Sequence, residues 1–122
     1  MSIVSDPTNT LLTEMIRATA LRHRVLASNL ANVETPGYEA QEMTFSRALA
    51  EARGSNPQRA GGPVSIQTAI ETDTDASPRR DGNSVDLDRQ MVKLAQNTGW
   101  HTAMIQILSN RFSMLKAAIR GT

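Results

Sequence analysis

The chain of 122 residues contains no cysteine, so disulfides, zinc–thiolate sites and thiol chemistry are all excluded. Aromatic residues make up only 3% of it, which leaves few bulky side chains to build a thick core. Its net charge is +1 with both signs present, so the composition does not predict binding to nucleic acid or anionic lipid. No run approaches the roughly 20 apolar residues of a membrane span. We expect a single small domain, 1–122, that is not a compact monomer.

The first twenty residues do not resemble a secretory leader. They contain Asp6, Glu14 and scattered apolar residues, whereas the general secretory route recognises a basic region followed by an apolar one. On this ground alone, the sequence predicts a cytoplasmic protein.

A long N-terminal helix is predicted over residues 7–33, roughly 40 Å at 1.5 Å per residue. Asp6 can cap it and Pro7 suits its first position, while Pro36 and Gly37 form the turn that ends it. Steps of four and three residues select a stripe that is apolar at its ends and polar at its centre: Leu12, Ile16, Thr19, His23, Leu26, Leu30 and Val33. Leu11, Met15 and Val25 broaden the apolar face beyond what one partner helix needs.

The connecting segment, residues 34–83, has a different composition. From about residue 51 it is rich in Gly, Pro, Ser, Asn and Asp, which predicts irregular, exposed structure. The alternating residues Val64 to Ile70 can form a short edge strand that folds back as a hairpin.

A second helix is predicted over residues 84–121, with Ser84 or Asp86 as its cap and Gly121 at its stop. Its length of roughly 50 Å exceeds what a small globule needs. Gly99 interrupts the helix at a cost of up to about 1 kcal/mol. Steps of four and three residues select a coiled-coil-like stripe: Leu87, Met91, Leu94, Thr98, His101, Ile105, Leu108, Phe112, Leu115 and Ile119.

The predicted fold is therefore all-α: two long helices packed as an antiparallel, coiled-coil-like hairpin, joined by an irregular segment that can include a short β-hairpin. Such a hairpin leaves apolar side chains uncovered, so partners are required. The residues expected to stay uncovered are Met104, Ile107 and Met114 on the second helix, and Leu11, Met15 and Val25 on the first.

No residue pattern predicts catalysis, a metal or another cofactor. His23 and His101 interrupt the two stripes, and we interpret them as polar residues that fix helix register, since no third and fourth zinc ligand follows. Asp86 and Asp88 are explained by helix capping, and Ser28 has no base beside it. We expect no enzyme and no small-molecule substrate.

Four segments together resemble a known family. They are residues 28–38 (SNLANVETPGY), 39–45 (EAQEMTF), 81–97 (DGNSVDLDRQMVKLAQN) and 115–121 (LKAAIRG). They are similar to the axial proteins of the bacterial flagellum, the family of rod, hook and hook-associated subunits, and most of all to its proximal rod members. In that family Glu is more frequent at the position of Gln90, and the pattern that Gly99 and Trp100 replace usually ends in Tyr.

The resemblance implies a structural subunit of the proximal rod, part of the axial shaft that transmits torque and surrounds the export channel. It implies partners: other copies, adjoining rod subunits, and proteins of the membrane-ring and export-gate junction. It also implies export by the flagellar type III apparatus, without a cleaved signal peptide, to the periplasmic rod of the basal body. The alternative from the residues alone is a cytoplasmic helical adaptor that binds one partner helix.

Candidate subunit-interface residues follow from the stripes, from Trp100 as a large packing anchor and from the turn motif. For the turn motif, contacts between subunits and turn chemistry within the chain are equally good interpretations. The candidates are Leu12, Ile16, Leu26, Asn29, Leu30, Asn32, Pro36, Gly37, Tyr38, Leu94, Trp100, Met104, Ile105, Ile107, Leu108, Phe112 and Leu115.

Overall fold

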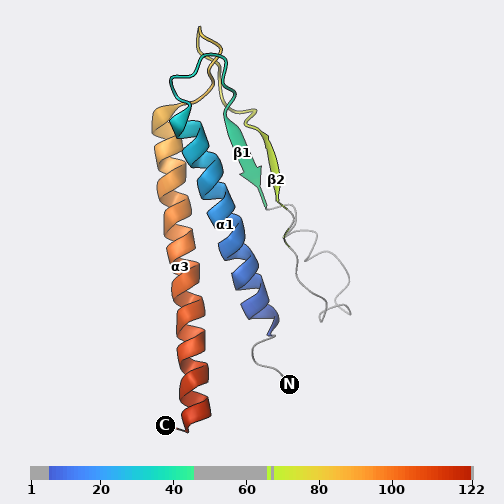
Figure 1. The fold of residues 1–122 in the computed structure, drawn as a ribbon, viewed down its shortest axis with the longest axis vertical. Coiled ribbons are helices and arrows are strands. Elements are labelled where there is room, and N and C mark those ends of the chain that lie inside the picture. Colours follow the sequence, from blue (N-terminus) through green and yellow to red (C-terminus); the bar gives the residue numbers. More distant parts are fainter. Residues whose placement is uncertain (1–5, 46–65, 67, 122) are drawn as a thin grey trace.

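The computed structural model describes residues 6–45, 66 and 68–121. Its elements are α1 (Pro7–Ala31), β1 (Gln41–Thr44), β2 (Ala69–Thr72) and α3 (Leu87–Arg120). The helices run antiparallel, and α1 lies between α3 and the strands in the view of Figure 1. The predicted helical hairpin is confirmed, with a small sheet added to it.

The helix ends depend on side chains near the predicted positions. Asp6 Oδ1 accepts a hydrogen bond from the Thr8 amide (3.1 Å) at the start of α1, as predicted. α1 ends at Ala31, two residues before the predicted Val33, because the Asn32 side chain turns back to donate to the Ser28 carbonyl (2.8 Å). That bond takes up a carbonyl left open at the helix end.

α3 begins and ends as its capping residues indicate. Asp86, one of the two predicted caps, accepts from the Arg89 amide (3.2 Å), so the helix starts at Leu87. Gly121 follows the last turn with a positive φ of 69°. The negative charge of Asp88 in the first turn and the positive charge of Arg120 in the last both suit the helix dipole.

The two strands form an antiparallel pair in which Gln41 lies opposite Thr72 and Thr44 opposite Ala69. The predicted strand at 64–70 is displaced to 69–72, and its partner is the segment just after the turn motif. Residues 64, 65 and 67 of that prediction, and the predicted irregular stretch 51–65, lie outside the described residues.

The apolar core lies between α1 and the strands. Ala18 and Val25 of α1 are buried against Met43 and Ile66. Leu11, Met15, Leu21 and Phe45 pack around this cluster. The expectation that Leu11, Met15 and Val25 stay uncovered is therefore wrong, because the strands cover that side of α1.

The face that α3 turns toward α1 differs from the predicted stripe by a rotation of the helix. Its more buried residues are Gln90, Leu94, Asn97, His101, Met104, Leu108, Arg111 and Leu115, which again follow steps of four and three. Five predicted stripe residues are instead exposed: Leu87, Met91, Ile105, Phe112 and Ile119. Met104, expected to be uncovered, lies partly buried on the inner face. The rotation lets Gln90, Asn97 and Arg111 reach hydrogen-bond partners on α1.

At one end of the hairpin, the turn after α1 and the segment before α3 are joined by backbone hydrogen bonds. The Gly37 amide donates to the Asp81 carbonyl (2.9 Å), and the Ser84 amide donates to the Tyr38 carbonyl (3.0 Å). Gly37 and Gly82 have φ values of 75° and 82°, as the predicted Pro-Gly turn requires of Gly37. A Cβ on Gly82 would lie 3.4 Å from the Gly37 Cα, so the two turns touch. We call this region, residues 32–40 and 81–86, the joint.

Asn83 is the central side chain of the joint and is fully buried. Its Nδ2 lies within hydrogen-bond distance of the carbonyls of Asn32 (2.9 Å), Val33 (3.1 Å) and Thr35 (2.7 Å). Its Oδ1 accepts from the Val85 amide (2.7 Å). One amide thus satisfies the open carbonyls after α1 and orders the approach to α3.

Replacing Asn83 with Ala should lower the free energy of unfolding by about 1–3 kcal/mol, because buried carbonyls and an amide lose their partner. Chemical denaturation of the purified chain, followed by circular dichroism, measures this loss. Asn110→Ala, at an exposed position of α3, is the matched control and should change stability little. Equal effects of the two substitutions would contradict the role given to Asn83.

Candidate functional site

Asn29 of the turn motif connects three elements and is fully buried. Its side chain accepts from the Gln41 amide (2.9 Å) and donates to the Gln41 carbonyl (2.7 Å), as a neighbouring strand would. It also donates to Gln90 Oε1 of α3 (3.1 Å). Asn29 therefore docks the start of β1 and the first turns of α3 onto α1.

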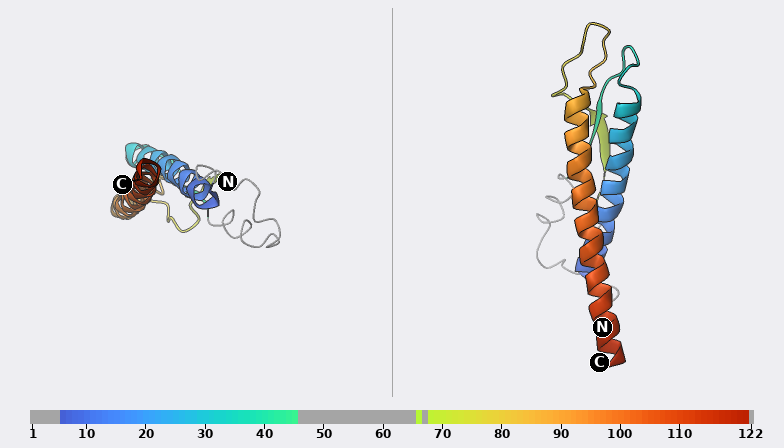
Figure 2. Two further views of the ribbon diagram at one scale, coloured as in Figure 1. Left: turned by 90° about the horizontal axis from the view of Figure 1, so that it is seen from below. Right: turned by 90° about the vertical axis from the view of Figure 1, so that its left-hand side faces the viewer.

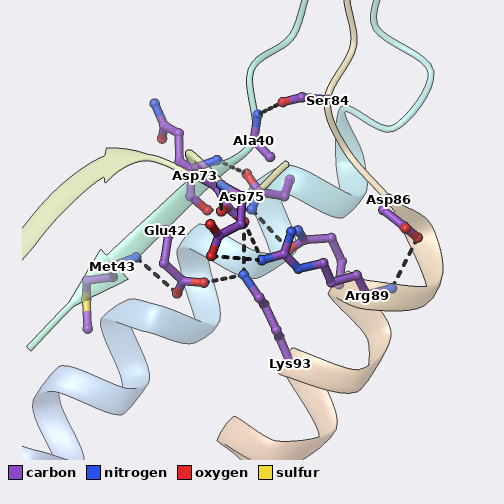
Figure 3. Close-up of polar contacts among 12 residues, drawn as sticks. Ala40, Glu42, Met43, Asp73, Asp75, Ser84, Asp86, Arg89 and Lys93 are labelled. Atoms are coloured by element: carbon purple, nitrogen blue, oxygen red, sulfur yellow. Dashed lines mark hydrogen bonds and ion pairs between the residues drawn. The ribbon is translucent and has the colours of Figure 1, made fainter. Parts of the chain in front are cut away.

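A cluster of charged side chains ties the strands to α3 next to the joint (Figure 3). The Lys93 ammonium lies between two carboxylates: it forms an ion pair with Glu42 of β1 and lies 3.0 Å from Asp73 Oδ2. Arg22 of α1 binds the other oxygen of Glu42 (3.2 Å). Arg89 approaches Asp73 at 3.6 Å. The cluster thus connects both helices to both strand segments.

Asp73 is the most buried carboxylate of the cluster, with 8% of its surface exposed. Burial by itself raises the pKa of Asp73, because it removes water from the charged form. The hydrogen bonds from Lys93 and the Asp75 amide, with the charges of Lys93 and Arg89, outweigh burial and hold the pKa below its ordinary value. The carboxylate is therefore charged at neutral pH, and its charge stabilises the fold.

The middle of the α1–α3 contact is polar. Asn97, at 1% exposure, donates to the Thr19 carbonyl (2.8 Å), and His101 Nδ1 lies 2.8 Å from the Thr19 hydroxyl. Among the described residues, Asn97 Oδ1 has no hydrogen-bond partner. His101 occupies the register position predicted for it, whereas His23 is exposed, so the prediction of a core role for His23 is wrong.

A second polar contact lies near the start of α1. Arg111 donates to Asn9 Oδ1 (2.6 Å) and forms an ion pair with Asp6. Asp6 is also the cap of α1, so the ion pair joins that cap directly to α3. Polar contacts at three levels, through Gln90, Asn97 and Arg111, thus specify how the helices are aligned.

Two rows of apolar side chains on α3 remain exposed. The first, which we call the Phe112 row, comprises Leu87, Met91, Ile105, Phe112 and Ile119. The second, the Trp100 row, comprises Trp100, Ile107 and Met114, each seven residues from the next. Seven residues are close to two helical turns, so each row follows one side of α3, and the face packed on α1 runs between them. Phe112 is 42% and Trp100 54% exposed.

The Phe112 row borders an open groove near the C-terminal end of α3. The groove is lined by residues that include Ile105, Leu108, Phe112, Lys116 and Ile119. Figure 2 shows α3 continuing past the first residue of α1 at this end. The last turns of α3 are therefore not covered by the described part of α1.

The structure places the predicted interface residues in three environments. Leu26 and Asn29 are buried inside the chain. Partly buried are Leu12, Ile16, Leu30, Asn32, Tyr38, Leu94, Met104, Leu108 and Leu115, and exposed are Pro36, Gly37, Trp100, Ile105, Ile107 and Phe112. Asn29 and Asn32 act in turn and cap chemistry within the chain. Contacts between subunits remain a prediction for the whole set.

Sequence reasoning missed the buried polar residues that hold the hairpin together. They are Asp73, Asn83, Ser84, Gln90 and Asn97. One signal was available: an asparagine just before a capped helix resembles an Asx turn, and Asn83 does bond to the amide two residues on. For Gln90 and Asn97 no local signal exists, since their partners are 61 and 78 residues away in the sequence.

The described residues contain no group of three or more His, Asp or Glu side chains that could hold a metal ion. None of the helices within this part of the chain is both long and apolar enough to cross a membrane.

A helical hairpin that is aligned by buried polar contacts and exposes two apolar rows on its longer helix has the architecture of an assembly subunit. Comparison with known proteins gives the particular class. No protein-family model matches the chain. Over 108 residues it is 35% identical to the flagellar basal body rod protein FlgB of Cereibacter sphaeroides (strain ATCC 17029 / ATH 2.4.9), covering 82% of this chain and 84% of that protein.

Two further relatives carry the same name. The rod protein FlgB of Bacillus subtilis (strain 168) is 28% identical over 129 residues, with 99% of this chain and 98% of that protein covered. FlgB of Salmonella typhimurium is 25% identical over 123 residues, with coverages of 88% and 89%. The chain belongs to the FlgB family of flagellar basal-body rod proteins. It is a structural, non-enzymatic subunit of the proximal rod.

Replacing Asp73 with Asn should lower the free energy of unfolding by about 1–3 kcal/mol at pH 7, because Lys93 and Arg89 lose a buried charged partner. The lowered pKa means that the folded chain binds fewer protons than the unfolded chain at acid pH, so acid weakens the wild type. The difference between wild type and variant should therefore shrink as the pH falls below about 4, through the pKa of the folded state.

Denaturant titrations from pH 7 to pH 3 measure both effects. Glu71→Gln, an exposed carboxylate on β2, is the matched control and should leave the pH profile of stability unchanged within about 0.5 kcal/mol. A gap between wild type and D73N that stays constant across this range would show that Asp73 is not the group responsible.

Proposed function

We propose that the chain builds the rod by packing against several neighbouring subunits through the Phe112 row and the Trp100 row of α3. The neighbours are other copies and adjoining flagellar rod subunits, and at the base of the rod the proteins of the membrane-ring and export-gate junction. The assembled subunits form the shaft that transmits torque and surrounds the export channel. The subunit reaches the periplasmic rod through the flagellar type III apparatus, without a cleaved signal peptide.

The observation that carries this proposal is that the apolar rows lie on two sides of α3. Each row exposes at least three large apolar side chains, and covering apolar surface stabilises an assembly by about 25 cal/mol per Å². Two different surfaces let a subunit contact two different neighbours, and such contacts extend into a helical tube when the rotation between neighbours does not close. A single-partner adaptor requires only one such surface.

Among the predicted interface residues, the exposed ones are the best candidates for direct contact. Four of them, Trp100, Ile105, Ile107 and Phe112, lie in the two rows. Pro36 and Gly37 lie exposed at the joint, where the end of one subunit can meet the next. Leu26 and Asn29 support assembly indirectly, since they hold the hairpin that presents these surfaces.

A shaft must also resist twisting, and the described contacts favour this. The joint and the charged cluster hold one end of the hairpin, and Arg111 links the helices near the other. Because these contacts join residues far apart in the sequence, one helix cannot slide along the other without breaking several of them. The hairpin can therefore transmit force between neighbours as one unit.

Substituting Asp at one position in each row tests the proposal. Phe112→Asp and Ile107→Asp should each abolish incorporation of the chain into detergent-extracted basal bodies, since each buries a charge at a contact. Both should also abolish swimming in a strain that lacks the wild-type gene. Gln106→Asp, at an exposed polar position of α3, is the matched control and should leave both unchanged.

Circular dichroism of the purified variants separates lost assembly from lost folding. Helical content equal to that of the wild type is expected for all three, because the substituted side chains are exposed. Loss of incorporation from only one row would favour a single contact surface. Normal incorporation and motility of both row variants would overturn the proposal.

A further inference from the structure

Charge is distributed unevenly along the fold, although the whole chain is nearly neutral. From residue 89 to the end of α3 there is no Asp or Glu, and the charged residues are Arg89, Lys93, Arg111, Lys116 and Arg120. The joint and strand segments, residues 32–45 and 68–88, have only Arg79 and Arg80 against the acids Glu34, Glu39, Glu42, Glu71, Asp73, Asp75, Asp81, Asp86 and Asp88. One end of the hairpin is therefore acidic and the other basic.

Contacts within the chain use some of these charges and leave others on the surface. Lys93 and Arg89 bind Asp73 beside the joint, and Arg111 binds Asp6 near the other end. Asp88 remains exposed in the first turn of α3. Lys116 and Arg120 are exposed in its last turns. Opposite charges thus stand at the two ends of the same helix.

Each of these exposed charges lies beside exposed apolar side chains. Asp88 is flanked on the helix surface by Leu87, Met91 and Val92, all about half exposed. Lys116 lines the groove that the Phe112 row borders, together with Ile105 and Ile119. Both surfaces combine an apolar patch with one charge, and the two charges have opposite sign.

We propose that a second copy of this chain occupies the groove, with its Leu87–Val92 turn against the Phe112 row and its Asp88 facing Lys116. This inference rests on the proposed function and specifies which parts of two copies meet. The contact is head to tail, because the groove and the turn that fills it are different surfaces. Asp88 and Lys116 are 28 residues apart on one helix, so parallel copies are offset by about 40 Å along their axes.

Charge reversal tests the pairing in solution. Asp88→Lys and Lys116→Glu should each weaken self-association of the full chain by about fivefold, and the double variant should restore it, because the swapped charges attract again. Sedimentation at several protein concentrations measures this, and wild-type association should weaken with added salt. A double variant no better than either single one would overturn the pairing.

The absence of native cysteine allows a direct test within the assembled rod. Cells that express Asp88→Cys and Lys116→Cys chains together should yield disulfide-linked dimers of the mixed kind after mild oxidation of isolated basal bodies. The variant with both cysteines should yield a ladder of longer chains. Asp88→Cys with Thr102→Cys, an exposed position between the two sites, is the matched control and should give none.

The outcomes separate this inference from the proposed function. Incorporation of the cysteine variants without mixed dimers would overturn the head-to-tail contact and leave the rod role standing. Cross-links from Lys116→Cys to a cysteine placed in another rod protein, and not to Asp88→Cys, would show that the groove holds a different partner. Loss of incorporation of the row variants described above would instead reject the rod role itself.

Discussion

Buried amide side chains that must find hydrogen-bond partners determine the rest of this structure. Asn29, Asn83 and Asn97 are almost completely buried, and each reaches across to a segment distant in the sequence. An unpaired amide in such a place costs more than a paired one contributes, so only one alignment of the helices is favourable. That alignment turns Gln90, Asn97 and Arg111 toward α1, and this in turn leaves the most apolar rows of α3 uncovered.

The sequence predicted what local chemistry controls. The cap at Asp6, the Pro-Gly turn, the cap at Asp86 and the stop at Gly121 each depend on residues within a few positions, and the structure has them all. The antiparallel hairpin followed from two long periodic segments joined by a turn. The FlgB-family relationship was also evident from the turn motif and the segment before α3, which the structure brings together at the joint.

The face of α3 that packs on α1 could not be predicted, because hydrophobic periodicity assumes that the most apolar stripe is buried within the chain. Leu87, Ile105 and Phe112 break that assumption, since a subunit of an assembly can reserve its most apolar surface for neighbours. Likewise, Leu11 and Met15 seemed to be spare until β1 and Ile66 covered them. Pairing between segments some 25 residues apart in the sequence has no local signal.

The links between α1 and α3 lie crosswise to the helix axes, at Gln90, at Asn97 with His101, and at Arg111. A load along the axis therefore pulls on all of them at once, as shear acts on a row of rivets, whereas a peeling load would break them one after another. A drive shaft that pushes and pulls its subunits lengthwise meets the hairpin in its stronger direction. Failure under load should therefore be abrupt, with all rungs lost together.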